Sequence, residues 1–365
     1  MRVLHVIARM NVGGTATYLA NLLQGLEKLG VENLLVMGNV PKGETEDGVV
    51  NNLPHVRIET LSRELNFKLD WSARSAIEKE IERFKPDIIH THTFKAGFLV
   101  RLKVRKTPVI HSFHGHHLYD PEFGFFKRSV LNVIERVLAP RADAIITIGK
   151  RVRDELLAVH IGKRGQYTAI APGIESLEIR DEESVRTQFG FKSDEILVVW
   201  LGRFTAVKRP DRVIEIAQKV SSVRFVMAGG GEMFEEVKKS APANVTFVGY
   251  QDKNDMWRIA DIALCTSDSE GMPLALIEAQ MAGVPVVSTD VGSVSEIVED
   301  GVSGRLTSRD SAALADAVKE VIDSIKLSDQ MGIAARYRAT REFSSEVMAQ
   351  AHIDLYRKIL GKVKQ

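Results

Sequence analysis

The sequence predicts an α/β fold with two doubly wound parallel sheets in tandem, and three observations support this prediction. Short runs of β-branched and aliphatic residues alternate with segments in which apolar residues recur at helical spacing. This alternation stops once, in a charged and aperiodic stretch, and then resumes. The chain has 365 residues, of which 44% are hydrophobic, so it is long enough to build two separate cores.

The first half of the chain reads as repeated strand and helix units. The opening run leads into Gly13 and Gly14, and leucines at helical spacing follow. Because consecutive β-α units form parallel sheets that are covered on both faces, we expect one such sheet here. The expected strands span residues 3–8, 33–37, 87–91, 108–113 and 144–148, and the expected helices span 72–84 and 125–138.

The charged stretch from about Ile174 to Glu195 is interpreted as a linker between two domains. A second parallel sheet is expected after it, with strands at 196–201, 224–228, 245–248, 261–265 and 285–288. The residues after Phe343 have the pattern of one amphipathic helix. The predicted domains are 1–173, joined by a C-terminal helix of about 346–365, and 174–345.

Composition narrows the possible partners and compartments. The formal net charge of +1 gives no support for nucleic-acid binding. The single cysteine, Cys265, rules out an internal disulfide and fits a reducing compartment, so the cytoplasm is expected. No apolar run approaches the roughly 20 residues that cross a bilayer. Any membrane contact is therefore expected to be peripheral.

The segment 268–279 is the most informative part of the sequence. It follows an expected strand, and Pro273 suits the first position of a helix, so a helix is expected to begin at Met272 or Pro273. Such a helix start presents free backbone donors and the positive end of a dipole, which together suit a diphosphate. Glu270 precedes the helix and Glu278 lies within it, among small apolar residues. Two carboxylates at this spacing suit a polyhydroxylated ligand, although solvated or capping carboxylates are the alternative.

A second cluster of polar residues follows the expected strand 196–201. Gly202 ends the strand, and Arg203 and Lys208 lie in the loop after it. Two cations at the carboxyl edge of a parallel sheet would neutralise a pyrophosphate and stabilise it as a leaving group. The alternative is a pair of ordinary surface cations.

This ordered series of motifs resembles glycosyltransferase family 4, which has the GT-B fold. The residues that carry the resemblance are Gly202-Arg203 with Lys208, then Ala228 to Glu232, Phe247 to Tyr250, and Glu270 to Glu278. The resemblance implies two Rossmann-like domains that face each other across a cleft, with the C-terminal helix crossing back to the first domain. It also implies a nucleotide-sugar donor on the second domain, net retention of anomeric configuration and no metal requirement.

The resemblance further implies a role for each matching residue. Arg203 and Lys208 would bind the donor diphosphate, Glu270 the donor-sugar hydroxyls and Glu278 the ribose. Backbone groups of the remaining donor-site residues would line the same pocket, and Tyr250 either stacks on the base or simply packs on the surface. These further residues are Gly249, Tyr250, Gly271, Met272, Pro273 and Leu274.

In the first domain, the Gly13-Gly14 turn leaves room for a substrate beside backbone donors. Residues 8–18 hold only these two glycines, so the three-glycine dinucleotide fingerprint is absent, which argues against a nicotinamide enzyme. In the resembled family the same loop lines the cleft beside the donor phosphate and the acceptor. The resemblance also implies that His114 reaches the donor sugar.

Histidines are concentrated in one part of the first domain. Six of the ten lie between His90 and His117. No cysteine or clear carboxylate accompanies them, so no metal site is predicted. His90 and His92 are expected to be hydrogen-bonded at strand ends. The segment from His116 to Asp120 either belongs to an acceptor pocket or caps the next helix.

The resulting functional hypothesis is a retaining glycosyltransferase that uses no cofactor besides its nucleotide-sugar co-substrate, for which UDP is expected. It would move a hexosyl or N-acetylhexosaminyl group to a carbohydrate or lipid-linked acceptor in surface glycan assembly. An epimerase of the same fold and a noncatalytic nucleotide-sugar sensor are the alternatives. Between Lys95 and Arg164, fourteen Lys or Arg residues face six Asp or Glu, so this region either docks on anionic lipid at the inner membrane face or forms solvated helix surfaces.

Overall fold

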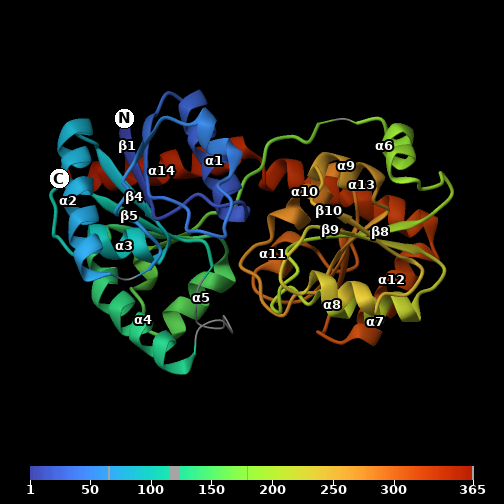
Figure 1. Cartoon of the computed structure of the whole chain (residues 1–365). Helices are drawn as coiled ribbons and strands as arrows, with labels where there is room; N and C mark the ends of the chain where they lie inside the picture. The colour runs from blue at the N-terminus through green and yellow to red at the C-terminus, as the bar shows by residue number, and fades with distance from the viewer. Residues whose placement is uncertain (65, 116–123, 179, 364–365) are drawn as a thin grey trace. The chain divides into compact units, whose positions relative to one another are not determined.

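The computed structural model describes residues 1–64, 66–115, 124–178 and 180–363. The chain divides into two compact units. Unit 1 comprises Met1–Gly173 together with Ser344–Gln365, and unit 2 comprises Ile174–Phe343. Figure 1 follows the chain from blue to red, so that the red C-terminal helix of unit 1 can be recognised beside the blue elements of the same unit.

Unit 1 is built on a parallel sheet of seven strands in the order β3-β2-β1-β4-β5-β6-β7. The chain winds outward from β1 to one edge and then returns past β1 to the other edge, so the strand order reverses between β1 and β4. The strands are β1 (Arg2–Ile7), β2 (Glu32–Met37), β3 (His55–Arg57), β4 (Ile88–His92), β5 (Val109–Phe113), β6 (Ala144–Thr147) and β7 (Tyr167–Ala169).

Helices cover both faces of this sheet (Figure 1). Leu4, Val6 and Ile89 point toward α2 and α3, with which they form an apolar core. The opposite face is covered by α1 and by α14, two helices that pack against each other. The described helices are α1 (Gly14–Lys28), α2 (Phe67–Phe84), α3 (Thr93–Arg101), α4 (Phe125–Leu138), α5 (Lys150–Ala158) and α14 (Ser345–Val363), with short 3₁₀ turns η1 (Gly48–Asn52), η2 (Ala139–Arg141) and η3 (Arg164–Gln166).

Unit 2 repeats this architecture with a parallel sheet of six strands in the order β10-β9-β8-β11-β12-β13. Here the order reverses between β8 and β11. The strands are β8 (Leu197–Leu201), β9 (Arg224–Ala228), β10 (Val245–Gly249), β11 (Ile262–Cys265), β12 (Val286–Thr289) and β13 (Gly304–Thr307). The helices are α6 (Glu182–Phe189), α7 (Pro210–Lys219), α8 (Phe234–Lys239), α9 (Lys253–Ile259), α10 (Leu274–Ala282), α11 (Val294–Ile297), α12 (Ser311–Ile322) and α13 (Ile325–Glu342).

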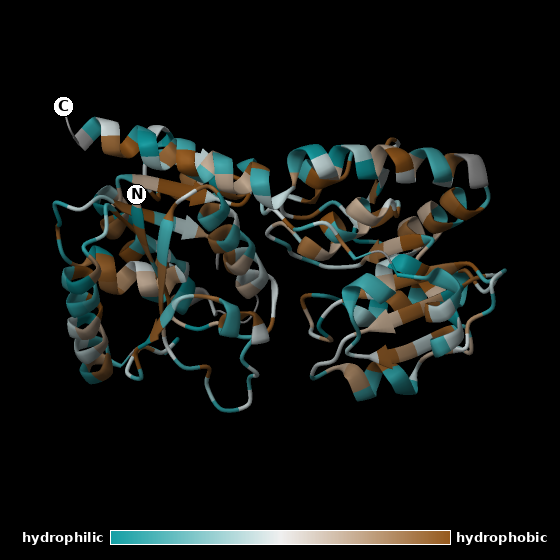
Figure 2. Ribbon diagram, turned by 90° about the horizontal axis from the view of Figure 1, so that it is seen from above, coloured by the Kyte–Doolittle hydropathy of each residue, from teal (hydrophilic) through white to brown (hydrophobic). Residues whose placement is uncertain are grey.

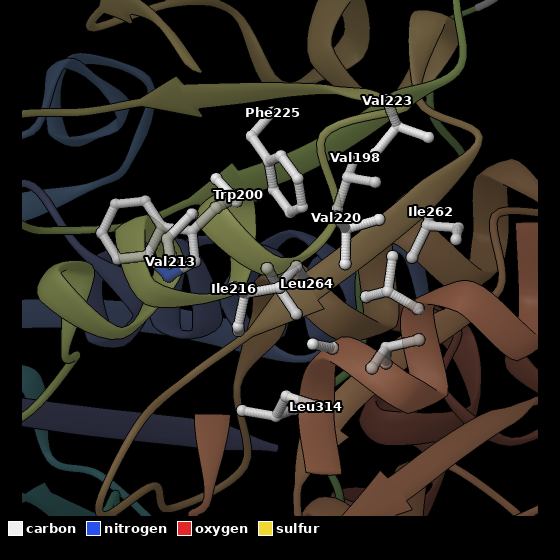
Figure 3. Close-up of a cluster of buried hydrophobic side chains, with 14 of the residues drawn as sticks. Val198, Trp200, Val213, Ile216, Val220, Val223, Phe225, Ile262, Leu264 and Leu314 are labelled. Atoms are coloured by element: carbon white, nitrogen blue, oxygen red, sulfur yellow. The ribbon is translucent and has the colours of Figure 1, made fainter. Parts of the chain in front are cut away.

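The core of unit 2 forms where the sheet meets α7 and α12. Figure 3 shows Val198, Trp200 and Phe225 from the strands beside Val213 of α7 and Leu314 of α12. In Figure 2 the strands are largely brown (hydrophobic), whereas many helices carry both brown and teal (hydrophilic) residues. A parallel strand is buried on both faces, and a surface helix buries only one stripe.

The fold class predicted from the sequence is confirmed by these two sheets, and two local expectations are wrong. The presumed linker contains α6, which Asp181 caps through the backbone N–H of Ser184 and which ends at Gly190 in a left-handed conformation. The helix of the 268–279 segment begins at Leu274 rather than at Met272 or Pro273, because Pro273 has extended backbone angles and is the residue before the first turn. The short strands β3, β7 and β13, and helices α3 and α5, were not among the expected elements.

Candidate functional site

In unit 2 the predicted donor loops lie at the point where the strand order reverses. The loop after β8 and the loop after β11 emerge at the same edge, because β8 and β11 are neighbouring parallel strands. Open α/β sheets place ligands at such a switch point. The backbone N–H of Asp268 donates to the carbonyl of Val207 at 2.9 Å, so the two loops are joined directly.

Thr266, directly after β11, also connects the two loops. Its hydroxyl donates to the carbonyls of Lys208 and Arg209, at 3.0 and 2.9 Å, and accepts from Nε1 of Trp200 at 3.0 Å. Arg212 adds a charged link, because its guanidinium donates to the carbonyl of Thr266 and to Oδ1 of Asp268. These bonds hold the conformation of both loops independently of a ligand.

Asp268 has a structural role in these loops, because both of its carboxylate oxygens pair with arginines. Its Oδ1 pairs with Arg212 at 2.8 Å and its Oδ2 with Arg209 at 3.3 Å. Burial acts to raise the pKa of the Asp268 carboxyl, but the hydrogen bonds and charge of the two arginines outweigh burial and hold the pKa below its usual value.

The structure brings together two of the predicted site residues, Lys208 and Glu270. Nζ of Lys208 lies 2.5 Å from Oε1 of Glu270, and the Ser267 hydroxyl donates to the same oxygen at 2.6 Å. The Glu270 side chain is only 8% exposed, and that of Lys208 is 25% exposed. Both bonds use Oε1, so within the described chain Oε2 of Glu270 keeps its acceptor capacity.

Glu278 lies just over one turn into α10 and is buried, as its apolar neighbours suggest. Its charge is balanced by Lys253, whose Nζ donates to Oε1 at 2.7 Å. Lys253 begins α9 and lies 25 positions away in sequence, so no local motif pointed to it. Pro273 precedes α10, and neither a side-chain cap nor an acidic residue in the first turn satisfies the donors there. The start of α10, with Met272 buried just before it, can therefore receive an anion.

Glycines let the strand ends of unit 2 approach one another closely. A Cβ on Gly229 would lie 2.0 Å from the carbonyl oxygen of Gly202, and one on Gly292 would lie 1.6 Å from that of Glu270. Both residues have positive φ angles of 125° and 53°. Gly292 follows β12 and packs against the Glu270 loop. In the same turn, the N–H of Ser293 donates to the carbonyl of Gly271 at 2.8 Å. This supporting turn was missed in the sequence, where only the glycine itself could have signalled it.

Tyr250 lies over the glycine turn rather than inside the unit. A Cβ on Gly230 would lie 2.8 Å from the Tyr250 ring, yet the side chain is 74% exposed. The N–H of Gly229 donates to the carbonyl of Gly249 at 2.7 Å, and this bond ties the β10 turn to the β9 turn. Arg203 is exposed, and within the described residues it makes no ion pair. The structure therefore brings Lys208 to Glu270 but gives no contact that joins Arg203 to either.

In unit 1 the Gly13-Gly14 turn forms the beginning of α1. Gly13 caps the helix without a side-chain bond and has a φ angle of 149°, and both glycines are exposed. A Cβ on Gly13 would meet nothing within 4 Å, so there is open space beside the turn. This arrangement leaves backbone donors of α1 available to a ligand.

The predicted histidine cluster lies at the carboxyl edge of the unit 1 sheet. Nδ1 of His92 lies 3.0 Å from Nε2 of His114, and the Tyr18 ring packs edge-on against the His114 ring. His90 bonds both Tyr356 and Ser112 at 2.7 Å. The residues from His116 to Asp120 lie outside the described part of the chain.

A trio of these histidines also has the spacing of metal ligands. Ring nitrogens of His5, His90 and His92 lie within 4.8 Å of one another. Every ring nitrogen of the three nevertheless has a hydrogen-bond partner in the structure. The cluster is therefore fully satisfied by protein groups.

Two shallow pockets in the described part of the chain lie away from these loops. One, of about 430 Å³, lies beside the starts of β1 and β2, and the other, of about 310 Å³, lies beside α13. Neither is lined by a residue of the glycine turns or of the Lys208 and Glu270 loops.

Comparison with known proteins gives matches to both units. A family model for glycosyltransferase family 4 matches residues 12–176, and a model for group 1 glycosyl transferases matches residues 181–338. EpsD of Bacillus subtilis, provisionally classed as a glycosyltransferase, is 28% identical over 314 residues, which cover 77% of this chain and 78% of EpsD. D-inositol 3-phosphate glycosyltransferase of Mycobacterium marinum is 27% identical over 75% of this chain, which spans 64% of that enzyme.

Solved structures support the same fold. Sucrose-phosphate synthase from Thermosynechococcus elongatus aligns with a TM-score of 0.86 at 19% identity, over 99% of this chain and all of its own. HepE of Anabaena in complex with UDP-glucose aligns with a TM-score of 0.81 at 18% identity, over 98% of this chain and all of its own. Two Rossmann-like parallel sheets with these structural neighbours show that the chain has the GT-B fold.

The two family matches together span both units, and the chain belongs to the GT-B glycosyltransferases of the family 4 type. No helix in the described residues is both long and apolar enough to span a membrane.

Proposed function

We propose that this glycosyltransferase moves a hexosyl or N-acetylhexosaminyl group from a UDP-sugar to an acceptor hydroxyl with retention of configuration and without a metal. The observation that carries the proposal is the contact between Lys208 and Glu270 at the switch point of unit 2. A cation and a carboxylate at one strand edge suit the two ends of a sugar diphosphate, since the cation binds phosphate and the carboxylate accepts from sugar hydroxyls. HepE, which shares the fold, was solved with UDP-glucose.

The remaining site residues have proposed roles that follow from their positions. The diphosphate lies at the start of α10, near Gly271 to Leu274, and Arg203 adds a second cation. Oε2 of Glu278 accepts from the ribose, because Oε1 is held by Lys253. Tyr250 stacks on the uracil beside Gly249. In unit 1, the proposed substrate contacts are His114 and the Gly13-Gly14 turn.

The proposed reaction needs no protein base. The acceptor oxygen forms its bond to the anomeric carbon on the face from which the diphosphate leaves. The bond from that carbon to the diphosphate oxygen breaks, and a diphosphate oxygen takes the acceptor proton. Lys208 contributes by stabilising negative charge on the leaving group, and Glu270 by orienting the sugar.

The first test pairs Lys208→Ala with Lys219→Ala, which removes an exposed cation at the far end of α7. A thermal-shift screen of nucleotide sugars identifies the donor, since a ligand at a hundred times its Kd adds about 2.7 kcal/mol to the folded state. With that donor, Lys208→Ala should lower kcat/KM by about a hundredfold or more, and Lys219→Ala should leave it unchanged. Equal activity of the two variants would refute the proposed role of Lys208.

Two further measurements separate the alternatives. The anomeric coupling constant of the product distinguishes retention from inversion. A reaction with donor alone distinguishes the transferase from an epimerase, which would convert the sugar without any acceptor. Tight donor binding with no turnover in the presence of acceptors would favour a sensor.

We also propose that unit 1 docks on anionic lipid through α4, which would give access to a lipid-linked acceptor. Phe126, Val130, Val133 and Val137 lie on one face of α4 and are exposed, Phe126 by 82%. Lys127 and Arg136 are exposed on the same helix. Apolar and basic side chains on one helix suit an acidic membrane interface.

Liposome co-sedimentation tests this docking surface. Binding should increase with the fraction of anionic lipid, and the double substitution Phe126→Ser with Val133→Ser should abolish it. Ile333→Ser removes another exposed apolar side chain, on α13 of unit 2, and should leave binding unchanged. Binding that is independent of anionic lipid would overturn the proposal.

A further inference from the structure

A layer of buried polar side chains lies between the unit 1 sheet and the helices α1 and α14. Because side chains alternate along a strand, Leu4, Val6 and Ile89 enter the apolar core under α2 and α3, and their neighbours His5, His90 and His92 project to the opposite face. All three histidines are fully buried. This layer continues to His114, just beyond the end of β5.

The inner end of the layer is anchored by Asn33 of β2. Its amide nitrogen donates to the carbonyls of Leu23 and Val31, at 3.2 Å each. These two bonds fix the orientation of the amide, so Oδ1 must face Nε2 of His5 at 3.3 Å. A carbonyl oxygen can only accept, and Nε2 of His5 must therefore carry the proton.

The imidazole rings of His5, His92 and His114 are neutral, so each ring carries a proton on only one of its two nitrogens. Burial lowers the pKa of His5 and of His114 to about 3, and burial also lowers the pKa of His92 well below its usual value. A neutral imidazole that donates through one nitrogen must accept through the other.

The protonation of each ring then fixes that of the next. Nδ1 of His5 carries a lone pair, so Nε2 of His92 donates to it across 3.1 Å. Nδ1 of His92 is in turn an acceptor, and Nε2 of His114 donates to it across 3.0 Å. Nδ1 of His114 is left with a lone pair and with no hydrogen-bond partner among the described residues.

We propose that Asn33 is a positioning residue that acts through His5 and His92 to fix the tautomer of His114, whose Nδ1 becomes an obligate acceptor at the carboxyl edge of the sheet. The group that His114 recognises must therefore be a hydrogen-bond donor such as a sugar hydroxyl. A carboxylate or phosphate oxygen at that position is excluded, because two acceptors would face each other. The identification of this donor with a hydroxyl of the substrate rests on the proposed function, whereas the tautomer does not.

The decisive experiment reads the tautomers directly by long-range ¹H–¹⁵N correlation on protein with ¹⁵N-labelled histidine, after chelator treatment at pH 7.5. His5, His92 and His114 should each show the Nε2–H form. His352 and His55 provide internal controls of the opposite kind, because each donates through Nδ1 to a backbone carbonyl and should show the Nδ1–H form. An Nδ1–H form of His114 in the wild-type protein would overturn the proposal.

A pair of substitutions then tests the role of Asn33. In Asn33→Leu the acceptor is lost, so His114 should no longer hold a single Nε2–H form, whereas Asn33→Asp keeps an acceptor and should keep the wild-type pattern. If Asn33→Leu does not fold, His5→Phe interrupts the same series one step later and should release His114 in the same way. An unchanged Nε2–H signal of His114 in the folded variant would refute the inference.

Kinetics provide a second readout that structural damage would not mimic. We expect Asn33→Leu to lower kcat/KM by about tenfold, and Asn33→Asp to restore it, while the thermal shift produced by UDP is the same in both variants because the donor loops lie in unit 2. If no nucleotide sugar supports turnover in the wild-type protein, the proposed function fails and the tautomer measurement still decides this inference. If turnover is present but equal in all variants, the positioning role is refuted.

Discussion

At the scale of single residues, the conformation of the predicted donor loops of unit 2 depends on glycines. Gly229 and Gly249 both have positive φ angles, of 125° and 70°. They differ in their surroundings, since a Cβ on Gly229 would overlap the carbonyl oxygen of Gly202, whereas a Cβ on Gly249 would meet nothing within 4 Å. The same substitution at the two positions therefore separates steric overlap from backbone strain.

Gly249→Ala should cost about 1–2 kcal/mol of unfolding free energy, which is the price of a left-handed conformation for an L-residue. Gly229→Ala should cost more than twice that amount, because the chain must also separate β8 from β9 at their ends. Urea unfolding of unit 2, followed by the fluorescence of the buried Trp200 and Trp257, measures both costs. Equal losses at the two positions would contradict this account.

Single residues also show how the charges of the two predicted carboxylates are balanced. The sequence placed Glu270 and Glu278 near a ligand, and in the structure each is held through one oxygen by a lysine. A half-occupied carboxylate keeps acceptor capacity for a sugar while its charge is balanced. Lys208 was predicted as part of the site and Lys253 was not, because only Lys208 lies in a recognisable motif.

At the scale of secondary structure, the start of α10 is the proposed anion-binding element of the site. The helix begins at Leu274 with no side-chain cap and no acidic residue in its first turn. An acidic residue there would satisfy the helix itself and stabilise it. The absence of one leaves the donors and the positive end of the dipole to a ligand.

Ala275→Asp should therefore change stability and binding in opposite directions. The new carboxylate should stabilise the folded unit by about 0.3–1 kcal/mol through the helix dipole. The same charge should weaken binding of UDP by at least about tenfold, because it repels the diphosphate. Urea unfolding and calorimetric titration with UDP measure the two effects, and Ala275→Gln serves as the neutral control. Unchanged UDP affinity in Ala275→Asp would show that the diphosphate binds elsewhere.

At the scale of the whole molecule, the two units differ in what they bury. All ten histidines belong to unit 1. Burial lowers the pKa of His5 and His114 to about 3 and that of His352 to about 4. The unfolded chain binds protons at these groups below about pH 6.5, whereas the folded unit does not bind them until the pH approaches 4 to 3.

The stability contributed by these neutral histidines is complete above about pH 6.5 and declines as the pH falls toward 3 to 4. For each such histidine, the unfolding free energy should fall by about 2 kcal/mol between pH 7 and pH 5. We expect His352→Gln to reduce the loss of unfolding free energy over this interval by about that amount, and His160→Gln, at an exposed position, to leave the loss unchanged. Urea titrations at the two pH values measure the difference, and equal pH dependence in wild type and His352→Gln would disprove the assignment.

Local patterns determined much of the fold. The strand and helix units of both sheets, and the amphipathic C-terminal helix, follow from periodicity, because parallel strands are apolar on both faces and surface helices on one. The helix α6 escaped prediction because it is short and mostly polar, and it depends on its cap at Asp181. The short edge strands were missed because three or four residues carry too little periodicity.

By itself, the sequence determined the two-sheet α/β class, the glycine turns and the resemblance to family 4, because each of these depends on patterns among residues that are close together in the sequence. Only the tertiary structure decided which groups hold one another. Lys208 and Glu270 are 62 positions apart, and His90 and Tyr356 are 266 apart. No spacing rule joins residues at such distances. Their contact follows from the strand order, which brings β8 beside β11, and from the packing of α14 on the unit 1 sheet.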